Sequence, residues 1–174
     1  MKNLTMLATA ALLAACQNAP QQTAEEARAT AALQPTKGSK AIGEVTFEQQ
    51  GDKVHVLANV QGLKPGAEHG FHIHEAGDCS APDASSAKGH FNPAGKAHGN
   101  PAAAEHHAGD LPALKAAENG RAKLDTTIGG VTLAPGPTSI VGRAVVIHAD
   151  PDDYTSQPAG NSGARIACGV IRAS

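Results

Sequence analysis

The fold class is indicated first by residues 41–60, AIGEVTFEQQGDKVHVLANV. Apolar and polar side chains roughly alternate over residues 41–47 and again over residues 54–60. This period of two is typical of a β-strand with one buried face. The pair Gly51-Asp52 between the two runs is typical of a hairpin turn. The stretch therefore predicts two antiparallel strands joined by a tight turn.

The rest of the chain shows the same pattern of short strands separated by turns. Strand-like runs occupy residues 68–75, 121–133, 142–148 and 164–171, with no convincing long amphipathic helix between them. The 19 glycines and 11 prolines place much of the backbone in turns or irregular loops. The pattern predicts an all-β protein, either an antiparallel sandwich or a barrel.

The composition fits one domain with a short appendage. The chain has 174 residues, of which 41% are hydrophobic, so it can bury one core. Only 2% of the residues are aromatic, and a core of Val, Ile, Leu and Ala suits strands. The formal net charge of −2 argues against a nucleic-acid-binding protein, which would normally carry a basic face.

The N-terminal segment has the features of a signal peptide. Met1-Lys2 supplies a positive start, and residues 4–14 form an apolar run too short to span a bilayer. The run ends in Leu-Ala-Ala-Cys at Cys16, which resembles the lipobox of bacterial lipoproteins. We expect residues 1–15 to be removed and Cys16 to carry lipid. The alternative is ordinary cleavage after a small residue, which would leave Cys16 as a free thiol.

Residues 16–38 are then predicted to form a flexible tether, and residues 39–174 the folded domain. The tether consists mostly of Ala, Gln, Thr and Pro, with little that could form a core. The lipid would hold the protein at a membrane of the bacterial cell envelope, facing the periplasm. Gln17 stands where an Asp is often linked to inner-membrane retention, which favours the outer membrane. The sequence is compatible with either a monomer or a homodimer.

Two further cysteines remain once Cys16 is lipidated. Cys79 and Cys168 would then lie in an oxidising compartment, where we expect them to form a disulfide. The alternative is two free buried thiols.

The unusual feature of the composition is its nine histidines, most of which fall between positions 69 and 107. His72 and His74 lie two residues apart within a predicted strand, so their side chains share one face and can converge on one ion. Two surface histidines are the alternative interpretation. His148 ends the apolar run 145–147, where a lone histidine could equally be a satisfied, partly buried residue.

A second set of histidines lies in a stretch without strand or helix periodicity, from Cys79 to about residue 114. A structureless loop of this length is uncommon in a compact domain unless something organises it. His90, His98, His107 and Asp110 recur along it, and three imidazoles with one carboxylate suit tetrahedral zinc. The alternative is a solvated, histidine-rich loop.

Several blocks, taken together and in order, resemble the signature blocks of copper/zinc superoxide dismutases over about residues 39–172. They are GFHIHE at 70–75, GHFNP at 89–93, HG at 98–99, HAGD at 107–110 and GNSGARIACGVI at 160–171. The resemblance implies an all-β, Greek-key antiparallel sandwich or flattened barrel of about eight strands, with two long functional loops. It also implies one copper and one zinc per subunit and the dismutation of superoxide to oxygen and hydrogen peroxide.

The same resemblance implies a ligand set. Copper would be bound by His72, His74, His90 and His148, and zinc by His90, His98, His107 and Asp110. His90 would bridge the two metals and take part in proton uptake. The neighbouring His106 is an alternative to His107, but the spacing to Asp110 favours His107, and His106 is expected to face solvent. His69 resembles a structural histidine, whereas His55 has no match and is expected to be exposed.

The resemblance also implies two residues that act beside the metals. Asp152 would link a copper ligand to a zinc ligand, although Asp150 and Asp153 compete for this role. Arg165 would attract the superoxide anion. Ala159 stands in place of a threonine found in many relatives, and Lys88 and Lys96 are candidates for further steering charges. A non-catalytic metal carrier on the same fold and a purely structural cell-surface sandwich are the competing functions.

Overall fold

The computed structural model describes residues 27–174. It contains ten strands and one short 3-10 turn at Ser85–Ala87. The strands are β1 (Arg28–Pro35), β2 (Ile42–Gln50), β3 (Lys53–Gln61), β4 (Glu68–His69), β5 (Phe71–His74), β6 (Leu114–Lys115), β7 (Ala122–Ile128), β8 (Ala144–His148), β9 (Arg165–Val170) and β10 (Arg172–Ala173). Within this part of the chain, no helix is long and apolar enough to cross a membrane.

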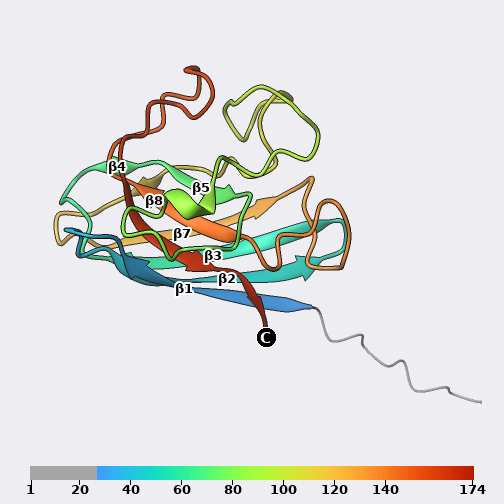
Figure 1. Ribbon diagram of the computed structural model, residues 1–174, viewed down its shortest axis with the longest axis horizontal. Helices are drawn as coiled ribbons and strands as arrows, with labels where there is room; N and C mark the ends of the chain where they lie inside the picture. The colour runs from blue at the N-terminus through green and yellow to red at the C-terminus, as the bar shows by residue number, and fades with distance from the viewer. Residues whose placement is uncertain (1–26) are drawn as a thin grey trace, which may run out of the picture.

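Eight of these strands form one antiparallel sheet that curls into a half-barrel. Its order is β5-β8-β9-β1-β2-β3-β7, with β10 also paired to β1, while β4 and β6 form a separate pair. β1 pairs with β2 through residues 28–33 and with β9 through Gln34 and Pro35. It therefore connects the β1-β2-β3-β7 part of the sheet to the β5-β8-β9 part. Figure 1 shows β5 and β8 lying over β1, β2 and β3. A late strand beside the first one is a Greek-key arrangement, and the predicted all-β fold is confirmed.

The hairpin predicted from residues 41–60 is present. β2 and β3 pair from Ile42 and Gln61 to Gln50 and Lys53, so that Gly51 and Asp52 form the turn. Gly51 has a φ of 61°, a left-handed conformation that glycine adopts without steric cost. The apolar positions of both strands are buried, including Val45, Phe47, Val54 and Val56 at 0% exposure. The period of two therefore identified the buried face correctly.

The folded domain begins earlier than the sequence predicted. Residues 28–35, which fall within the predicted tether, form β1 between β2 and β9. Ala29, Ala31 and Leu33 alternate into the core with at most 1% exposure. Alanines contribute little hydrophobic contrast, so this alternation is weak in the sequence, and neighbouring strands supply most of the burial. Residues 1–26, which include Cys16 and the predicted signal peptide, lie outside the described residues.

Two long loops lie on the same side of the curled sheet. One runs from the end of β5 to β6, and the other from β8 to β9. In Figure 1 parts of them rise side by side above the strands, in yellow-green and orange-red. They are the two irregular stretches expected from the sequence, and the candidate site lies where they meet β5 and β8.

Candidate metal centre

β5 presents two histidines on one face. His72 and His74 are at most 1% exposed, while Ile73 between them packs in the hydrophobic core. β8 pairs with one edge of β5. The first long loop pairs with the other edge, because Ile73 N–H donates to Gly109 O and Phe91 N–H donates to Ile73 O, both at 2.8 Å. This pairing carries the neighbouring loop residues to the histidines of the strand.

Four imidazoles meet in a first group, with one nitrogen of each within 4.8 Å of the others. Its members are His72, His74, His90 and His148. His74 Nδ1–H donates to Lys88 O at 2.8 Å and His148 Nδ1–H donates to Gly163 O at 3.2 Å. Their Nε2 atoms are thereby left facing each other at 3.4 Å. His72 Nδ1 and His90 Nε2 are buried without a hydrogen-bond partner, so their lone pairs are free for a metal ion.

Three imidazoles and one carboxylate form a second group that shares His90 with the first. Its members are His90, His98, His107 and Asp110. Asp110 Oδ1 lies 2.9 Å from His90 Nδ1, 3.0 Å from His98 Nδ1 and 3.4 Å from His107 Nδ1. Asp110 Oδ2 accepts hydrogen bonds from the backbone N–H groups of Gly99 and His107, which fix the carboxylate. His90 therefore directs Nε2 to one group and Nδ1 to the other.

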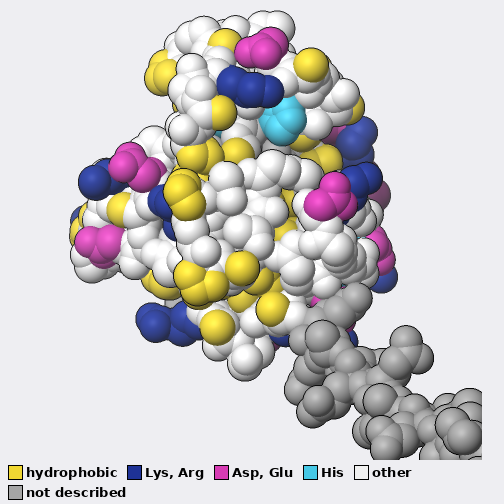
Figure 2. Space-filling model, turned by 90° about the vertical axis from the view of Figure 1, so that its right-hand side faces the viewer, with side chains coloured by type: hydrophobic (Ala, Val, Ile, Leu, Met, Phe, Trp, Pro, Cys, Tyr) yellow, Lys and Arg dark blue, Asp and Glu magenta, His cyan; other side chains and the backbone are white. Residues whose placement is uncertain are grey.

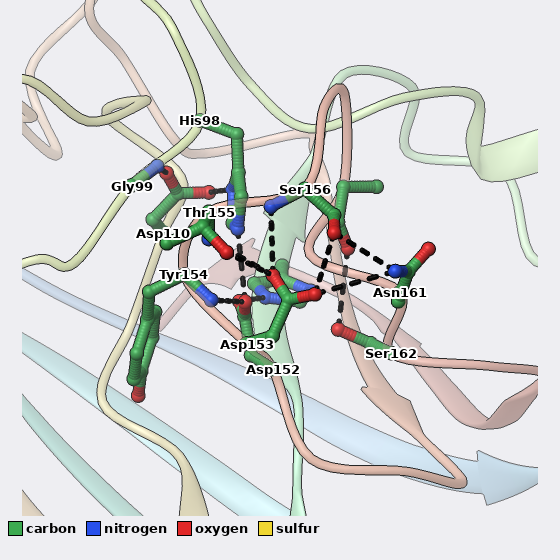
Figure 3. Close-up of polar contacts among 12 residues, drawn as sticks. His98, Gly99, Asp110, Asp152, Asp153, Tyr154, Thr155, Ser156, Asn161 and Ser162 are labelled. Atoms are coloured by element: carbon green, nitrogen blue, oxygen red, sulfur yellow. Dashed lines mark hydrogen bonds and ion pairs between the residues drawn. The ribbon is translucent and has the colours of Figure 1, made fainter.

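A single carboxylate, that of Asp152, contacts one histidine of each group. Asp152 Oδ2 lies 2.6 Å from His72 Nε2, and Asp152 Oδ1 lies 2.9 Å from His98 Nε2. Figure 3 shows His98 held between Asp110 and Asp152. Asp153 instead binds within its own loop, where it accepts hydrogen bonds from Thr155 and Ser156. Of the three competing acids, the structure brings Asp152 to the histidines.

Burial keeps three imidazoles of the first group, those of His72, His74 and His148, neutral. It lowers the pKa of His74 to about 2, that of His148 to about 3 and that of His72 to about 4. In the second group, burial opposes ionisation of Asp110, but hydrogen bonds from His90, Gly99 and His107 outweigh it and lower the Asp110 pKa. Neutral imidazoles and an ionised carboxylate are the forms that bind metal ions. The two orphaned nitrogens and this donor set fit two neighbouring metals.

Comparison with known proteins agrees with this geometry. The family model for copper/zinc superoxide dismutase (SODC) matches residues 41–171. The chain belongs to the copper/zinc superoxide dismutase family. Superoxide dismutase [Cu-Zn] 2 of Aquifex aeolicus (strain VF5) is 44% identical over 152 residues, covering 85% of this chain and 88% of the relative.

Two further relatives support the family. Superoxide dismutase [Cu-Zn] 1 of the same organism is 42% identical over 153 residues, covering 86% of this chain and 90% of that protein. A crystal structure of the clock protein EA4 superposes with a TM-score of 0.76 at 42% identity and covers 85% of this chain and 95% of that one. The cofactors of a copper/zinc superoxide dismutase are copper and zinc, and each of the two groups could hold a metal ion.

Arg165 lies beside the first group. Its guanidinium donates to Ala84 O at 2.6 Å and to Lys88 O at 2.5 Å. Lys88 O is also the acceptor for His74 Nδ1, so the arginine and a histidine of the first group share one carbonyl. Arg165 also pairs with His148 across β8 and β9. These contacts fix a positive charge next to the first group.

The disulfide between Cys79 and Cys168 is confirmed, with the two Cα atoms 5.8 Å apart. It joins the first long loop to β9, three residues after Arg165. The loop that supplies Ala84 O and Lys88 O is thereby attached to the strand that carries the arginine.

The remaining histidines lie outside both groups. His106 Nδ1–H donates to His107 O at 2.6 Å, His69 Nδ1–H donates to His148 O at 2.8 Å, and His55 Nε2 contacts Asp125 at 2.8 Å. Figure 2 shows little histidine surface on the face that it presents.

Of the two candidate steering lysines, Lys96 donates to Ala104 O within the loop, and Lys88 is exposed.

Sequence reasoning missed two residues of the second long loop. Gln157 contacts the backbone of His98, and the Tyr154 hydroxyl accepts a hydrogen bond from Ala113 N–H at 3.1 Å. A glutamine or a tyrosine in an irregular polar loop carries no periodic signal, so only the fold reveals these contacts.

Proposed function

We propose that the protein catalyses the dismutation of superoxide to oxygen and hydrogen peroxide. The observation that carries this proposal is the position of His90, whose Nδ1 atom lies 2.9 Å from Asp110 while its Nε2 atom is buried without a hydrogen-bond partner. One imidazole thus belongs to an all-histidine group and to a group with a carboxylate. Such a pair of sites suits two different metals acting together.

The proposed copper ligands are the four imidazoles His72, His74, His90 and His148, and the proposed zinc ligands are His90, His98, His107 and Asp110. Imidazole donors suit copper, and three imidazoles with one carboxylate suit zinc. Bound copper would supply the one-electron chemistry by alternating between its oxidised and reduced states. The zinc ligands come from one irregular loop, which their metal would hold in place.

Side chains of the protein would attract the superoxide anion and supply a proton to the reduced substrate. Arg165 places a fixed cation beside the first group and would draw in the superoxide anion. His90 Nε2 is buried and, when not bound to copper, would carry one of the two protons needed to form hydrogen peroxide, the second coming from solvent. His74 and His148 keep their Nε2 atoms directed into the group through backbone carbonyls at Nδ1.

The assignment is tested by substituting a proposed copper ligand. We expect His74→Ala to lose copper and to lower the dismutation rate by at least about a hundredfold, because a metal site that lacks one ligand binds weakly. His55→Ala is the matched control, since His55 lies on β3 and belongs to neither group. Wild-type activity in His74→Ala would refute the copper site. Binding of both metals by the unaltered protein without dismutation would instead indicate a metal carrier.

We also propose that Cys16 carries a lipid and that the domain faces the periplasm, on the outer membrane of its cell. The proposal is supported by the apolar run that ends in Leu-Ala-Ala-Cys. Growth with labelled fatty acid should label the unaltered protein and not a Cys16→Ser variant. Release of both proteins in soluble form from spheroplasts would contradict the anchor.

A further inference from the structure

We propose that Gln157 is a positioning residue that clamps the backbone of His98 and thereby slows the release of zinc. The inference rests on the proposed zinc site. Gln157 is not one of the proposed metal ligands, but its side chain hydrogen-bonds to the backbone of one of them, His98. The clamp lies between the two long loops, which the sequence separates by 59 residues at this point.

The side-chain amide of Gln157 satisfies both backbone groups of His98. His98 N–H donates to Gln157 Oε1 at 2.9 Å, and Gln157 Nε2–H donates to His98 O at 2.9 Å. The same Nε2 also donates to Thr155 O at 3.3 Å, which ties the amide to its own loop. A primary amide is suited to this arrangement because it carries a donor and an acceptor side by side.

The imidazole of His98 is held by the same loop at a separate point. Its Nε2–H donates to Asp152 Oδ1, and the Tyr154 N–H donates to that oxygen at 2.7 Å. The loop packs closely here, since a Cβ on Gly160 would lie 2.6 Å from His98 Nε2 and would clash with Asp152. Asp152 therefore orients the ring, while Gln157 holds the main chain from which the ring projects.

Both attachments are needed to fix the ligand nitrogen. A ring that is hydrogen-bonded only at Nε2 can still pivot about that bond if its backbone moves. Fixing the main chain removes this freedom and holds Nδ1 toward Asp110 Oδ1, at 3.0 Å. Preorganised ligands lose less entropy on binding a metal, and a restrained ligand leaves it more slowly.

The test compares two variants of Gln157 with a matched control elsewhere in the protein. Gln157→Ala removes both hydrogen bonds, while Gln157→Glu keeps the size and the acceptor but loses the donor to His98 O. The control is Gln49→Ala, because Gln49, near the end of β2, makes a similar clamp with residues that belong to neither metal group. Its Oε1 accepts from Leu133 N–H at 2.8 Å and its Nε2 donates to Gly51 O at 2.9 Å.

Two quantities are measured on the zinc-loaded protein. The first is hydrogen exchange of the His98 amide by NMR, and the second is the rate at which zinc passes to an excess of chelator. We expect Gln157→Ala to speed both by about tenfold, the effect of losing one or two hydrogen bonds. Gln157→Glu should also release zinc faster than the control. Gln49→Ala should speed exchange at Leu133 and leave both His98 exchange and zinc release unchanged.

The measurements distinguish failure of the clamp, failure of its positioning role and failure of the proposed zinc site. Unchanged His98 exchange in Gln157→Ala would overturn the clamp. Faster exchange with zinc release equal to that of Gln49→Ala would overturn the positioning role and leave Gln157 a structural residue. If His98→Ala retained zinc as well as the unaltered protein, the proposed zinc site itself would be wrong, whereas the exchange of the His98 amide would still decide whether the clamp exists.

Discussion

His72 Nε2 lies 2.6 Å from Asp152 Oδ2, and the two side chains are 0% and 1% exposed. An ionised carboxylate can only accept hydrogen bonds, so the proton of His72 is on Nε2 and the lone pair of Nδ1 faces the first group. The other oxygen of Asp152 imposes the same tautomer on His98. One carboxylate therefore sets the orientation of one histidine in each of the two groups.

Asp152→Asn is expected to weaken the binding of both metals by about 10- to 100-fold, as loss of an outer hydrogen-bond partner typically does. An asparagine can accept from one of the two histidines, but its NH₂ group then faces the N–H of the other. Competition with chelators of known affinity measures the effect for each metal. Asp52→Asn, in the exposed β2–β3 turn, is the control. Equal affinities in both variants would contradict the bridging role of Asp152.

Arg165→Glu is expected to lower kcat/KM by at least about tenfold while copper stays bound, because it reverses the charge next to the first group. The rate of the unaltered protein should fall as salt is added, and that of the variant should not. Pulse radiolysis at several ionic strengths measures both. Arg121→Glu, on an exposed residue before β7, makes the same change in net charge and should have a much smaller effect. Equal losses in the two variants would mean that net charge, not Arg165, guides the anion.

Reduction of the Cys79–Cys168 bridge should lower the thermal stability of the protein. A crosslink across a sequence separation of 89 restricts the unfolded chain and contributes about 4–5 kcal/mol to the free energy of unfolding. For a domain of this size, the loss corresponds to a fall in Tm of about 10–20 °C. Calorimetry with and without reductant measures the fall, after thiol titration has verified reduction. A Cys79→Ser/Cys168→Ser variant should not respond, and an unchanged Tm in the reduced protein would argue against a structural role.

The metal-free protein should lose stability as the pH falls below 6.5. In the unfolded chain, histidines take up protons near pH 6.5, whereas in the native protein burial holds the pKa of His72 to about 4 and that of His74 to about 2. The unfolded state therefore binds more protons between these values, and the free energy of unfolding falls by about 1.4 kcal/mol per pH unit for each such histidine. Above pH 6.5 this contribution to the pH dependence disappears.

Urea titrations of the metal-free protein at several pH values measure this slope. The lowered pKa of Asp110 acts in the same direction at more acidic pH, because its unfolded form takes up a proton that its native form rejects. His55→Gln, outside both groups, should keep the slope. A free energy of unfolding that stays constant from pH 7 to pH 5 would show that the buried histidines are not held neutral.

The sequence predicted those parts of the fold that follow from local periodicity. The β2–β3 hairpin repeats with a period of two, and the same period places His72 and His74 on one face of β5. β1 was missed because its buried positions include two alanines, whose burial depends on strands far away in the sequence. Periodicity thus located the strands in which large apolar residues alternate with polar ones.

The site could be predicted in residue type but not in its supporting contacts. The recurrence of His90, His98, His107 and Asp110 along a stretch without strand or helix periodicity favoured a metal site, with a solvated, histidine-rich loop as the alternative. The preference for Asp152 over its two acidic neighbours could not be derived from spacing, because it depends on how the loop folds back over β5. Gln157 left no sequence signal at all, since its partners are backbone atoms of the other loop.

A copper titration of the zinc-loaded, copper-free protein, with the superoxide dismutation rate measured after each addition, shows whether the first group holds the catalytic metal. If His72, His74, His90 and His148 hold the catalytic copper, activity should rise linearly with added copper and stop at about one copper per chain. The same titration of His74→Ala should give little activity. Full activity before copper is added, or no activity at one bound copper per chain, would show that these four histidines do not hold the catalytic metal.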